Sequence, residues 1–205
     1  MGRKSMNQSR AFKLCPLSTC PHFEELALHF DSTNRGIDNF FRKECPKFES
    51  TQKLKTFVLM DPIKNQIVGF FSSTVGLLTQ NVKKDDGTYK VDTPYINLAY
   101  FAIDKEYQGT GIGRALMMEF FSMCMVIALY TGVQLIYLES VDESVNFYKR
   151  LGYELLHKDA TPEAYQKFGN DTRNIQFPML RKISDLIADG HSPYIDNVLP
   201  INVEK

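Results

Sequence analysis

Three alternate glycines, Gly109, Gly111 and Gly113, constrain the fold of this chain more than any other feature. They follow a predicted strand at residues 96–103, where nearly every residue is apolar, as expected when both faces of a strand are covered. They precede a predicted helix at residues 112–130, where apolar residues recur at helical spacing. Glycine lets backbone N–H groups approach a ligand closely, and a helix N-terminus adds unpaired N–H groups and partial positive charge. The turn therefore predicts a site for a phosphate or pyrophosphate.

The glycine spacing excludes two common phosphate-binding motifs. It is not the G-x-G-x-x-G dinucleotide fingerprint, and Glu139 comes too late to be the acid that accompanies that fingerprint. It is not a P-loop either, because no Lys-Ser/Thr pair follows the last glycine. A plain strand-to-helix turn is the alternative, although one glycine would suffice for it.

The order of the remaining elements predicts an α/β fold with helices against the faces of a sheet. Further strands are expected at residues 12–14, 55–60, 66–75, 133–138, 153–156 and 174–180, and further helices at 22–30, 36–43 and 144–151. An exposed turn is expected at Asp85-Asp86-Gly87. We expect one domain over residues 1–182 and a C-terminal extension of unknown role over residues 183–205.

Composition and charge favour a soluble, cytoplasmic protein. The chain has 205 residues, 24 basic and 24 acidic, so its net charge is zero. Residues 1–55 carry ten Lys/Arg against six Asp/Glu, a mild basic excess that is far from a dedicated nucleic-acid binder. No apolar stretch suggests a membrane span, since the longest candidate, 123–130, is too short. The first ten residues lack the apolar run of a secretory signal.

The four cysteines are too few and too scattered for a disulfide framework. Cys15, Cys20 and His22 lie close together in the sequence. A zinc site would need a fourth ligand, and none is near them. We therefore expect no metal.

Two regions resemble the GNAT family of acetyltransferases. Residues 108–113, QGTGIG, resemble its R/Q-x-x-G-x-G/A signature, and residues 144–153, SVNFYKRLGY, are similar to its later A-x-x-x-Y-x-x-x-G-F motif. The match covers residues 95–157, with Val141 standing where many members have Asn. The resemblance implies a single GNAT-like α/β domain. Its sheet would be mixed, mostly antiparallel and twisted, with six or seven strands splayed centrally and about four flanking helices.

The resemblance also implies acetyl-CoA as cosubstrate, and hence an N-acetyltransferase. Its pantetheine arm would pair with the backbone of Phe101, Ala102 and Ile103. Its pyrophosphate would lie on the N–H groups of the glycine loop, formed by Gln108, Gly109, Thr110, Gly111, Ile112, Gly113 and Arg114. The Arg114 guanidinium could add a charge-assisted contact to phosphate.

Tyr148 holds the motif position of the family's proton donor, so the resemblance assigns it as general acid. A phenol stays protonated at neutral pH and can protonate a leaving thiolate. The alternative is an aromatic side chain that only packs beside Phe147. Glu139 is a candidate for the base that takes the amine proton. We favour the alternative that Glu139 is a solvated loop acid near a helix start.

Residues 30–41, FDSTNRGIDNFF, are similar to the opening of a GNAT branch of bacterial toxins, F-x-C/S-G-x-x-x-L-N-x-F-L. Thr33 replaces the glycine of that pattern and Asp38 replaces its asparagine. The branch acetylates the amino group of aminoacyl-tRNA. Four basic residues near this segment could contact tRNA phosphates: Arg35, Arg42, Lys43 and Lys47. Glu44 and Glu49 reduce the positive charge of this patch.

Several acceptors remain open at this stage. They are a small-molecule amine, a protein amino group and aminoacyl-tRNA. A non-catalytic acyl-CoA-binding module is the rival from another class, and it would need no proton donor such as Tyr148. A homodimer is compatible with the family, and the sequence decides neither that nor the existence of an antitoxin partner.

Overall fold

The computed structural model describes residues 12–167, 171–172 and 175–191. The opening segment, the irregular tail expected beyond residue 191 and the first residue of the strand expected at 174–180 lie outside these residues. The strands are β1 Lys13–Pro16, β2 Lys55–Asp61, β3 Gln66–Lys84, β4 Gly87–Ile103, β5 Leu135–Ser140, β6 Glu154–Leu155 and β7 Phe177–Lys182. The α-helices are α1 Phe23–His29, α2 Arg35–Asn39, α3 Cys45–Ser50, α4 Ile112–Tyr130, α5 Asp142–Lys149, α6 Pro162–Lys167 and α7 Ile183–Ala188. Three short helical turns are η1 Leu17–Thr19, η2 Phe40–Glu44 and η3 Lys105–Tyr107.

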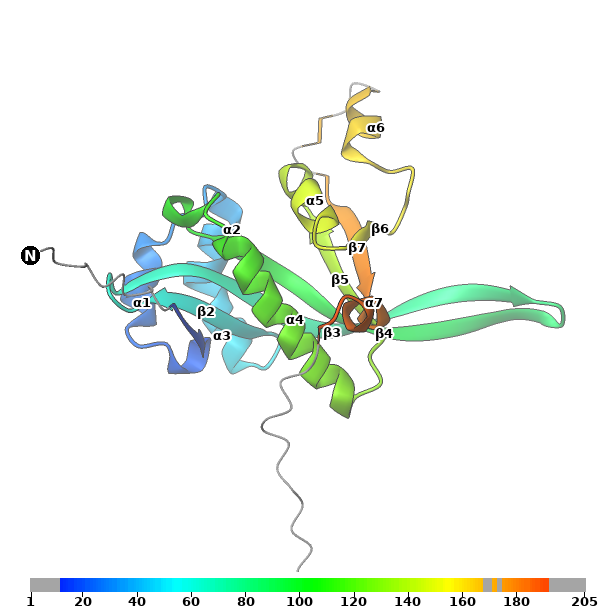
Figure 1. Ribbon diagram of the computed structural model, residues 1–205, viewed down its shortest axis with the longest axis horizontal. Helices are drawn as coiled ribbons and strands as arrows, with labels where there is room; N and C mark the ends of the chain where they lie inside the picture. The colour runs from blue at the N-terminus through cyan, green and yellow to red at the C-terminus, as the bar shows by residue number, and fades with distance from the viewer. Residues whose placement is uncertain (1–11, 168–170, 173–174, 192–205) are drawn as a thin grey trace, which may run out of the picture. The chain divides into compact units, whose positions relative to one another are not determined.

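The strands form a seven-stranded sheet in the order β1-β2-β3-β4-β5-β7-β6, traced in Figure 1. β5 pairs in parallel with the Tyr95–Leu98 part of β4. Antiparallel pairs join β1 to β2, β5 to β7 and β6 to β7. The prediction of a mixed, mostly antiparallel sheet of six or seven strands is confirmed.

The chain divides into two compact units, which are described separately. The first contains residues 1–72 and 100–116, and the second contains residues 73–99 and 117–205. β3, β4 and α4 contribute residues to both. The end of β4 and the start of α4, which flank the glycine loop, thus belong to the first unit.

An aromatic cluster forms the core of the first unit. The rings of Phe41 and Phe70 stack with centroids 3.9 Å apart. Phe23 and Phe30 each meet the Phe41 ring at 5.1 Å. All four side chains are buried, so α1 and η2 are fixed against β3 by the same cluster. Aromatic pairs in such geometries add to the stabilisation from area burial.

The helical segment after α1 is longer than predicted. The expected helix ended at residue 43, whereas helical structure continues through α2, η2 and α3 to Ser50. η2 is a π-helical turn directly before Pro46, which stands in the first turn of α3. Proline lacks an N–H and its ring clashes with the carbonyl four residues earlier. The wider π turn accommodates this residue without ending the helical segment.

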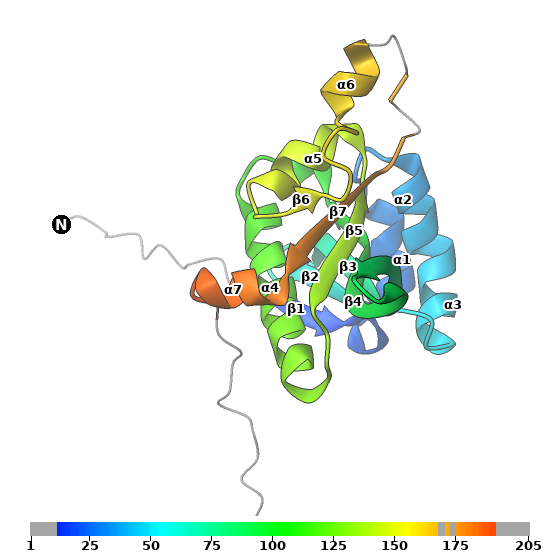
Figure 2. The ribbon, with the colours of Figure 1, turned by 90° about the vertical axis from the view of Figure 1, so that its right-hand side faces the viewer.

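The second unit contains β5, β7 and β6, and Figure 2 shows β7 between the other two. α5 is followed by Gly152 at φ +81°, the helix stop that the sequence predicted. Buried Arg181 donates a 2.6 Å hydrogen bond to the carbonyl of Leu151 and pairs with Asp189 of the turn after α7. This ties the end of α5 to β7.

β3 and β4 extend far beyond the predicted strands at 66–75 and 96–103, and they meet at the expected turn, Asp85-Asp86. α4 has the predicted bounds, and by length and composition alone it could cross a membrane. The core helices of soluble proteins pass the same test. Phe120, Phe121 and Cys124 of α4 are fully buried, so one face of the helix packs into the protein, and 33% of its apolar window is buried.

Candidate functional site

Asp104 organises the end of β4 in the first unit. Its backbone N–H donates to Val68 O at 2.9 Å, which continues the pairing with β3. Its buried carboxylate accepts from Asp31 N and from Glu106 N, both at 3.0 Å. The second bond caps η3. Sequence reasoning assigned Asp104 no role, although an acid at an N-cap position before a short helical turn was a usable signal.

Side-chain hydrogen bonds to backbone carbonyls hold the glycine loop in place. The Gln108 amide donates to Ile103 O at 2.9 Å and to Ser32 O at 3.1 Å. Thr110 Oγ1 donates to Tyr107 O at 2.6 Å. The predicted contact of residue 108 with a ligand can therefore come from its backbone, because its side chain supports the loop.

Gly109 and Gly111 have φ values of +73° and +89°, the left-handed region that favours glycine. A Cβ built on either residue would meet nothing within 4 Å. Ala115 N donates to Gly111 O at 3.1 Å. The N–H groups of the first helical residues, 112–114, have no intrahelical acceptor for geometric reasons. Open space thus adjoins two glycines and a helix N-terminus, an arrangement that fits a phosphate group.

The strand end before the loop packs closely on β3. A Cβ on Gly69 would lie 2.8 Å from Ala102 O and 2.6 Å from the Ile103 side chain. The side chains of Ala102 and Ile103 are buried, and Phe101 is half-buried. The parallel pairing of β4 with β5 covers Tyr95–Leu98 and ends before Phe101.

Tyr148 belongs to the second unit, on α5. Its side chain is buried, and its ring meets those of Phe147 and Tyr153 edge-on at 5.1 and 5.7 Å. Its carbonyl accepts from Leu151 N and Tyr153 N at the end of the helix. Burial raises the pKa of the Tyr148 phenol well above its ordinary value. The phenol therefore keeps its proton at neutral pH.

Glu139 is bound by its neighbour on β5. Its carboxylate accepts a 2.9 Å hydrogen bond from the Tyr137 phenol. Burial, and then this bond, raise the pKa of Tyr137. Asp142 lies in the first turn of α5 and accepts from Gln166 and Thr172. The N-cap of α5 is Val141, which supplies no side-chain acceptor.

The toxin-like segment before and within α2 has a defined local structure. Asn34 caps α2 by accepting from the N–H groups of Gly36 and Ile37. The buried Asp38 carboxylate accepts from Ser32 Oγ at 2.7 Å and from Ser32 N at 3.0 Å. An asparagine carbonyl could accept the same two bonds, which accounts for Asp38 at that position of the pattern.

Thr33 has a φ of +70°. This is where the toxin-branch pattern has glycine. The left-handed region is rare for a β-branched residue. The backbone of this chain thus keeps the conformation for which glycine is suited, at the cost of local strain.

The basic residues around this segment are not equivalent. Arg42 donates to Ala27 O at 3.0 Å and to Phe30 O, so its guanidinium secures the end of α1. Arg35, Lys43 and Lys47 are exposed. Glu49 is buried, and its carboxylate accepts hydrogen bonds from Thr56 N and Lys55 Nζ. It therefore does not reduce the positive charge of the surface. Among the candidates, three exposed cations remain.

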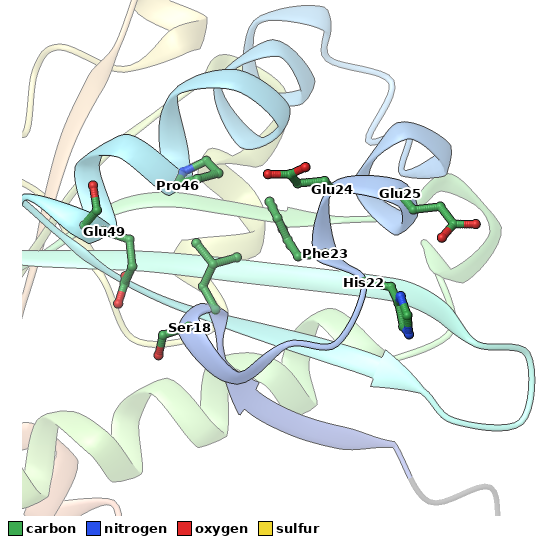
Figure 3. A pocket seen from close by; sticks show the side chains of 9 residues that line it. Ser18, His22, Phe23, Glu24, Glu25, Pro46 and Glu49 are labelled. Carbon is green, nitrogen blue, oxygen red and sulfur yellow. The ribbon is translucent and has the colours of Figure 1, made fainter.

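An open cavity of about 600 Å³ lies in the first unit between η1, α1 and α3. Figure 3 shows the side chains that line it, with Phe23 and Pro46 among the acids Glu24, Glu25 and Glu49. Its lining contains no lysine or arginine. The cavity is therefore unsuited to a phosphate. None of its lining residues belongs to the glycine loop. No group of three or more His, Cys, Asp or Glu that could hold a metal ion occurs among the described residues.

The family model described as Acetyltransferase (GNAT) domain matches residues 53–155, about half of the chain. This protein therefore belongs to the GNAT acetyltransferase family, as the sequence motifs predicted. Three solved structures share its fold. A bacterial toxin is 22% identical with a TM-score of 0.71, over 88% of this chain and 95% of the toxin. AtaTR bound with AcCoA is 16% identical with a TM-score of 0.70, over 88% and 98%. AtaT complexed with acetyl-methionyl-tRNAfMet is 16% identical with a TM-score of 0.68, over 88% and 100%.

The strained position at Thr33 gives a stability prediction. Thr33→Gly should raise the free energy of unfolding by about 1 kcal/mol, because relief of the left-handed strain exceeds the added chain entropy of glycine. Chemical denaturation of both proteins measures this. Thr88→Gly is the control, since Thr88 lies in a strand without positive φ and gains nothing. A loss of stability in Thr33→Gly equal to that in Thr88→Gly would contradict the argument.

Proposed function

We propose that this protein is an acetyl-CoA-dependent N-acetyltransferase. The observation that carries the proposal is the loop at the N-terminus of α4, where Gly109 and Gly111 are left-handed and adjoin open space. Backbone N–H groups of residues 108–114 would hold the pyrophosphate, and Arg114, which is exposed, would add a charged contact. The backbone of Phe101, Ala102 and Ile103 would hold the pantetheine arm. Family membership and the AcCoA-bound neighbour support this assignment.

Acetyl-CoA supplies a thioester that an amine can attack directly. The amine nitrogen forms a bond to the acyl carbon, the carbon–sulfur bond breaks, and the surplus amine proton passes to solvent. Backbone donors stabilise the negative charge on the acyl oxygen. We assign Tyr148 as the general acid whose Oη proton goes to the leaving sulfur, after which the phenolate takes up a proton from solvent to restore the acid. The raised pKa keeps the Tyr148 phenol protonated at neutral pH, and it also makes the phenol a weak acid. Proton transfer should therefore accompany bond cleavage, when charge develops on sulfur.

We further propose that the accepted amine is the amino group of an aminoacyl-tRNA. The toxin-like segment, residues 30–41, supports this. The Ser32–Asp38 hydrogen bonds and the Asn34 cap fix its backbone at positions where its sequence is similar to the toxin-branch pattern. Exposed Arg35, Lys43 and Lys47 are available for phosphates. The neighbour bound to acetyl-methionyl-tRNAfMet is consistent with this acceptor. A small amine or a protein amino group is the alternative.

Transfer of label from radioactive acetyl-CoA in a cell extract identifies the acceptor. We expect label in the tRNA fraction, lost when the tRNA is deacylated. Three exposed cations imply modest electrostatic binding, so transfer should fall as salt rises. Label among proteins or small molecules would discard the tRNA proposal and leave the acetyltransferase proposal standing. Absence of any label, with acetyl-CoA still bound, would indicate the non-catalytic module.

Gly111→Glu should abolish acetyl-CoA binding, with a loss of about 10²-fold or more in affinity. The new carboxylate would occupy the open space and repel the pyrophosphate. Titration calorimetry with acetyl-CoA measures the loss. Gly190→Glu is a matched control, because Gly190 is also exposed, has a φ of +84° and has nothing within 4 Å of its Cβ position. It should lose similar stability and keep binding. Unchanged affinity in Gly111→Glu would refute the loop as the site.

Tyr148→Phe should lower turnover by about 10² to 10⁴ while acetyl-CoA affinity stays within a few-fold. Tyr153→Phe is the control. Tyr153 is a buried neighbour whose hydroxyl has no hydrogen-bond partner among the described residues, so its removal should cost no activity. Steady-state turnover and calorimetry on both variants make the comparison. Equal turnover in the two variants would leave Tyr148 a packing residue only.

A further inference from the structure

The two faces of the β4–β5 pair in the second unit differ in burial. Side chains alternate between the faces of a strand. Four residues of one face are buried: Ile96, Leu98, Ile136 and Leu138. The residues between them point to the other face and remain half-buried or exposed, among them Tyr95, Asn97, Tyr137 and Glu139. Asn97 pairs with Tyr137 in the parallel register, so these four side chains share one accessible face.

Two tyrosine rings are fixed on this face. The centroids of the Tyr95 and Tyr137 rings lie 5.0 Å apart. The Tyr95 ring lies across Gly76 of β3, where a Cβ would come within 2.5 Å of the ring. The Tyr137 phenol donates a 2.9 Å hydrogen bond to the Glu139 carboxylate. We call Tyr95, Asn97, Tyr137 and Glu139 the tyrosine platform.

Two polar groups of the platform are available to a ligand. Within the part of the chain that the structure describes, neither the Asn97 amide nor the Tyr95 hydroxyl forms a hydrogen bond. The amide group of asparagine offers both donors and an acceptor. No neighbouring side chain uses these groups, so their hydrogen bonds can go to a bound molecule.

This combination of groups fits a nucleobase. Proteins recognise unpaired bases by stacking them on aromatic rings and by hydrogen bonds to the base edges. An asparagine amide matches N6 and N7 of adenine with one acceptor and one donor. The platform contains no lysine or arginine, so it is unsuited to phosphates, and the Glu139 carboxylate favours a cation nearby.

We infer that the tyrosine platform binds the terminal aminoacyl-adenosine of the acceptor tRNA. This inference rests on the proposed function and adds a binding site to it. The adenine stacks on Tyr95 and Tyr137, and its edge pairs with the Asn97 amide. The terminal nucleoside has no phosphate on its 3′ side, and its α-amino group, with a pKa of about 8, is partly cationic at neutral pH. Its charge therefore matches the single carboxylate of the platform.

The adenine of acetyl-CoA is the other source of this base, and the order of residues along the chain argues against it. From the glycine loop back along β4, the proposed pyrophosphate site comes first and the pantetheine site at residues 101–103 comes next. Tyr95 and Asn97 follow beyond the pantetheine site. The adenine of the coenzyme lies on the far side of the pyrophosphate from the thioester, which is the opposite direction. The acceptor must approach the thioester end.

Binding of an RNA hairpin that copies an acceptor stem and ends in CCA tests the inference by fluorescence anisotropy. Removal of the terminal adenosine should weaken binding to the wild-type protein about 10- to 100-fold, the range for one stacked base. Tyr137→Leu and Asn97→Ala should weaken binding of the complete hairpin and lose the preference for the terminal adenosine. Tyr130→Leu is the control, since Tyr130 is an exposed tyrosine at the end of α4, 71% accessible. It should keep the preference.

Pairing each protein variant with both hairpins separates a lost contact from a folding defect. A contact makes the two effects non-additive, and the loss of the adenosine alters no residue of the protein. A wild-type protein that binds both hairpins equally, or neither, would overturn the inference. A variant at Tyr137 and one at Asn97 that both keep the preference would do the same.

Calorimetry with acetyl-CoA distinguishes the two adenines. Acetyl-CoA affinity should be unchanged in Tyr137→Leu and Asn97→Ala, because neither residue belongs to the glycine loop or to residues 101–103. A loss of that affinity would assign the platform to the coenzyme and overturn the inference. Acetyl transfer to a small amine without any adenosine preference would overturn the platform and leave the acetyltransferase proposal standing. The two failures are thus separate outcomes.

Discussion

The buried Asp104 carboxylate is the interaction on which the candidate site depends. It joins the end of β4 to the segment before α2 through Asp31 N, and it starts η3 through Glu106 N. Lys105 adds a 2.8 Å ion pair to Asp31, which lowers the pKa of that carboxyl. The glycine loop begins directly after η3. Three side chains therefore set its position relative to the toxin-like segment: Asp104 and Lys105 through Asp31, and Gln108 through Ser32.

The sequence predicted the parts of the site that are local. The strand, the three glycines and the α4 helix are contiguous, and each has a distinct pattern of spacing and residue type. The helix stop at Gly152 was predictable for the same reason, because a left-handed C-terminal residue favours glycine. The family motifs added Tyr148, whose neighbours in the structure are aromatic as its sequence context suggested.

The features that sequence reasoning missed depend on distant partners. Arg42 was expected to face phosphates, but it binds two carbonyls at the end of α1. Glu49 was expected to dilute a basic surface, but it is buried against Thr56. The helical segment was ended too early, because a proline in a helical pattern normally marks a boundary. The sequence did not predict the two-stranded ribbon of residues 76–84 and 87–95, because Gly76 and Asn81 have low strand propensity. These residues are strands only because they pair across the turn.

The ribbon also affects how the first unit can assemble. That unit is built from two segments, residues 1–72 and 100–116, and the ribbon lies in the chain between them. Bringing the ends of an open loop of this length together costs on the order of 3 kcal/mol in chain entropy. A hairpin closes from its turn through contacts between residues near in sequence, on a timescale of roughly microseconds. Once the ribbon has closed, the two segments are already adjacent, so its pairing offsets the entropic cost of joining the glycine loop to the rest of its unit.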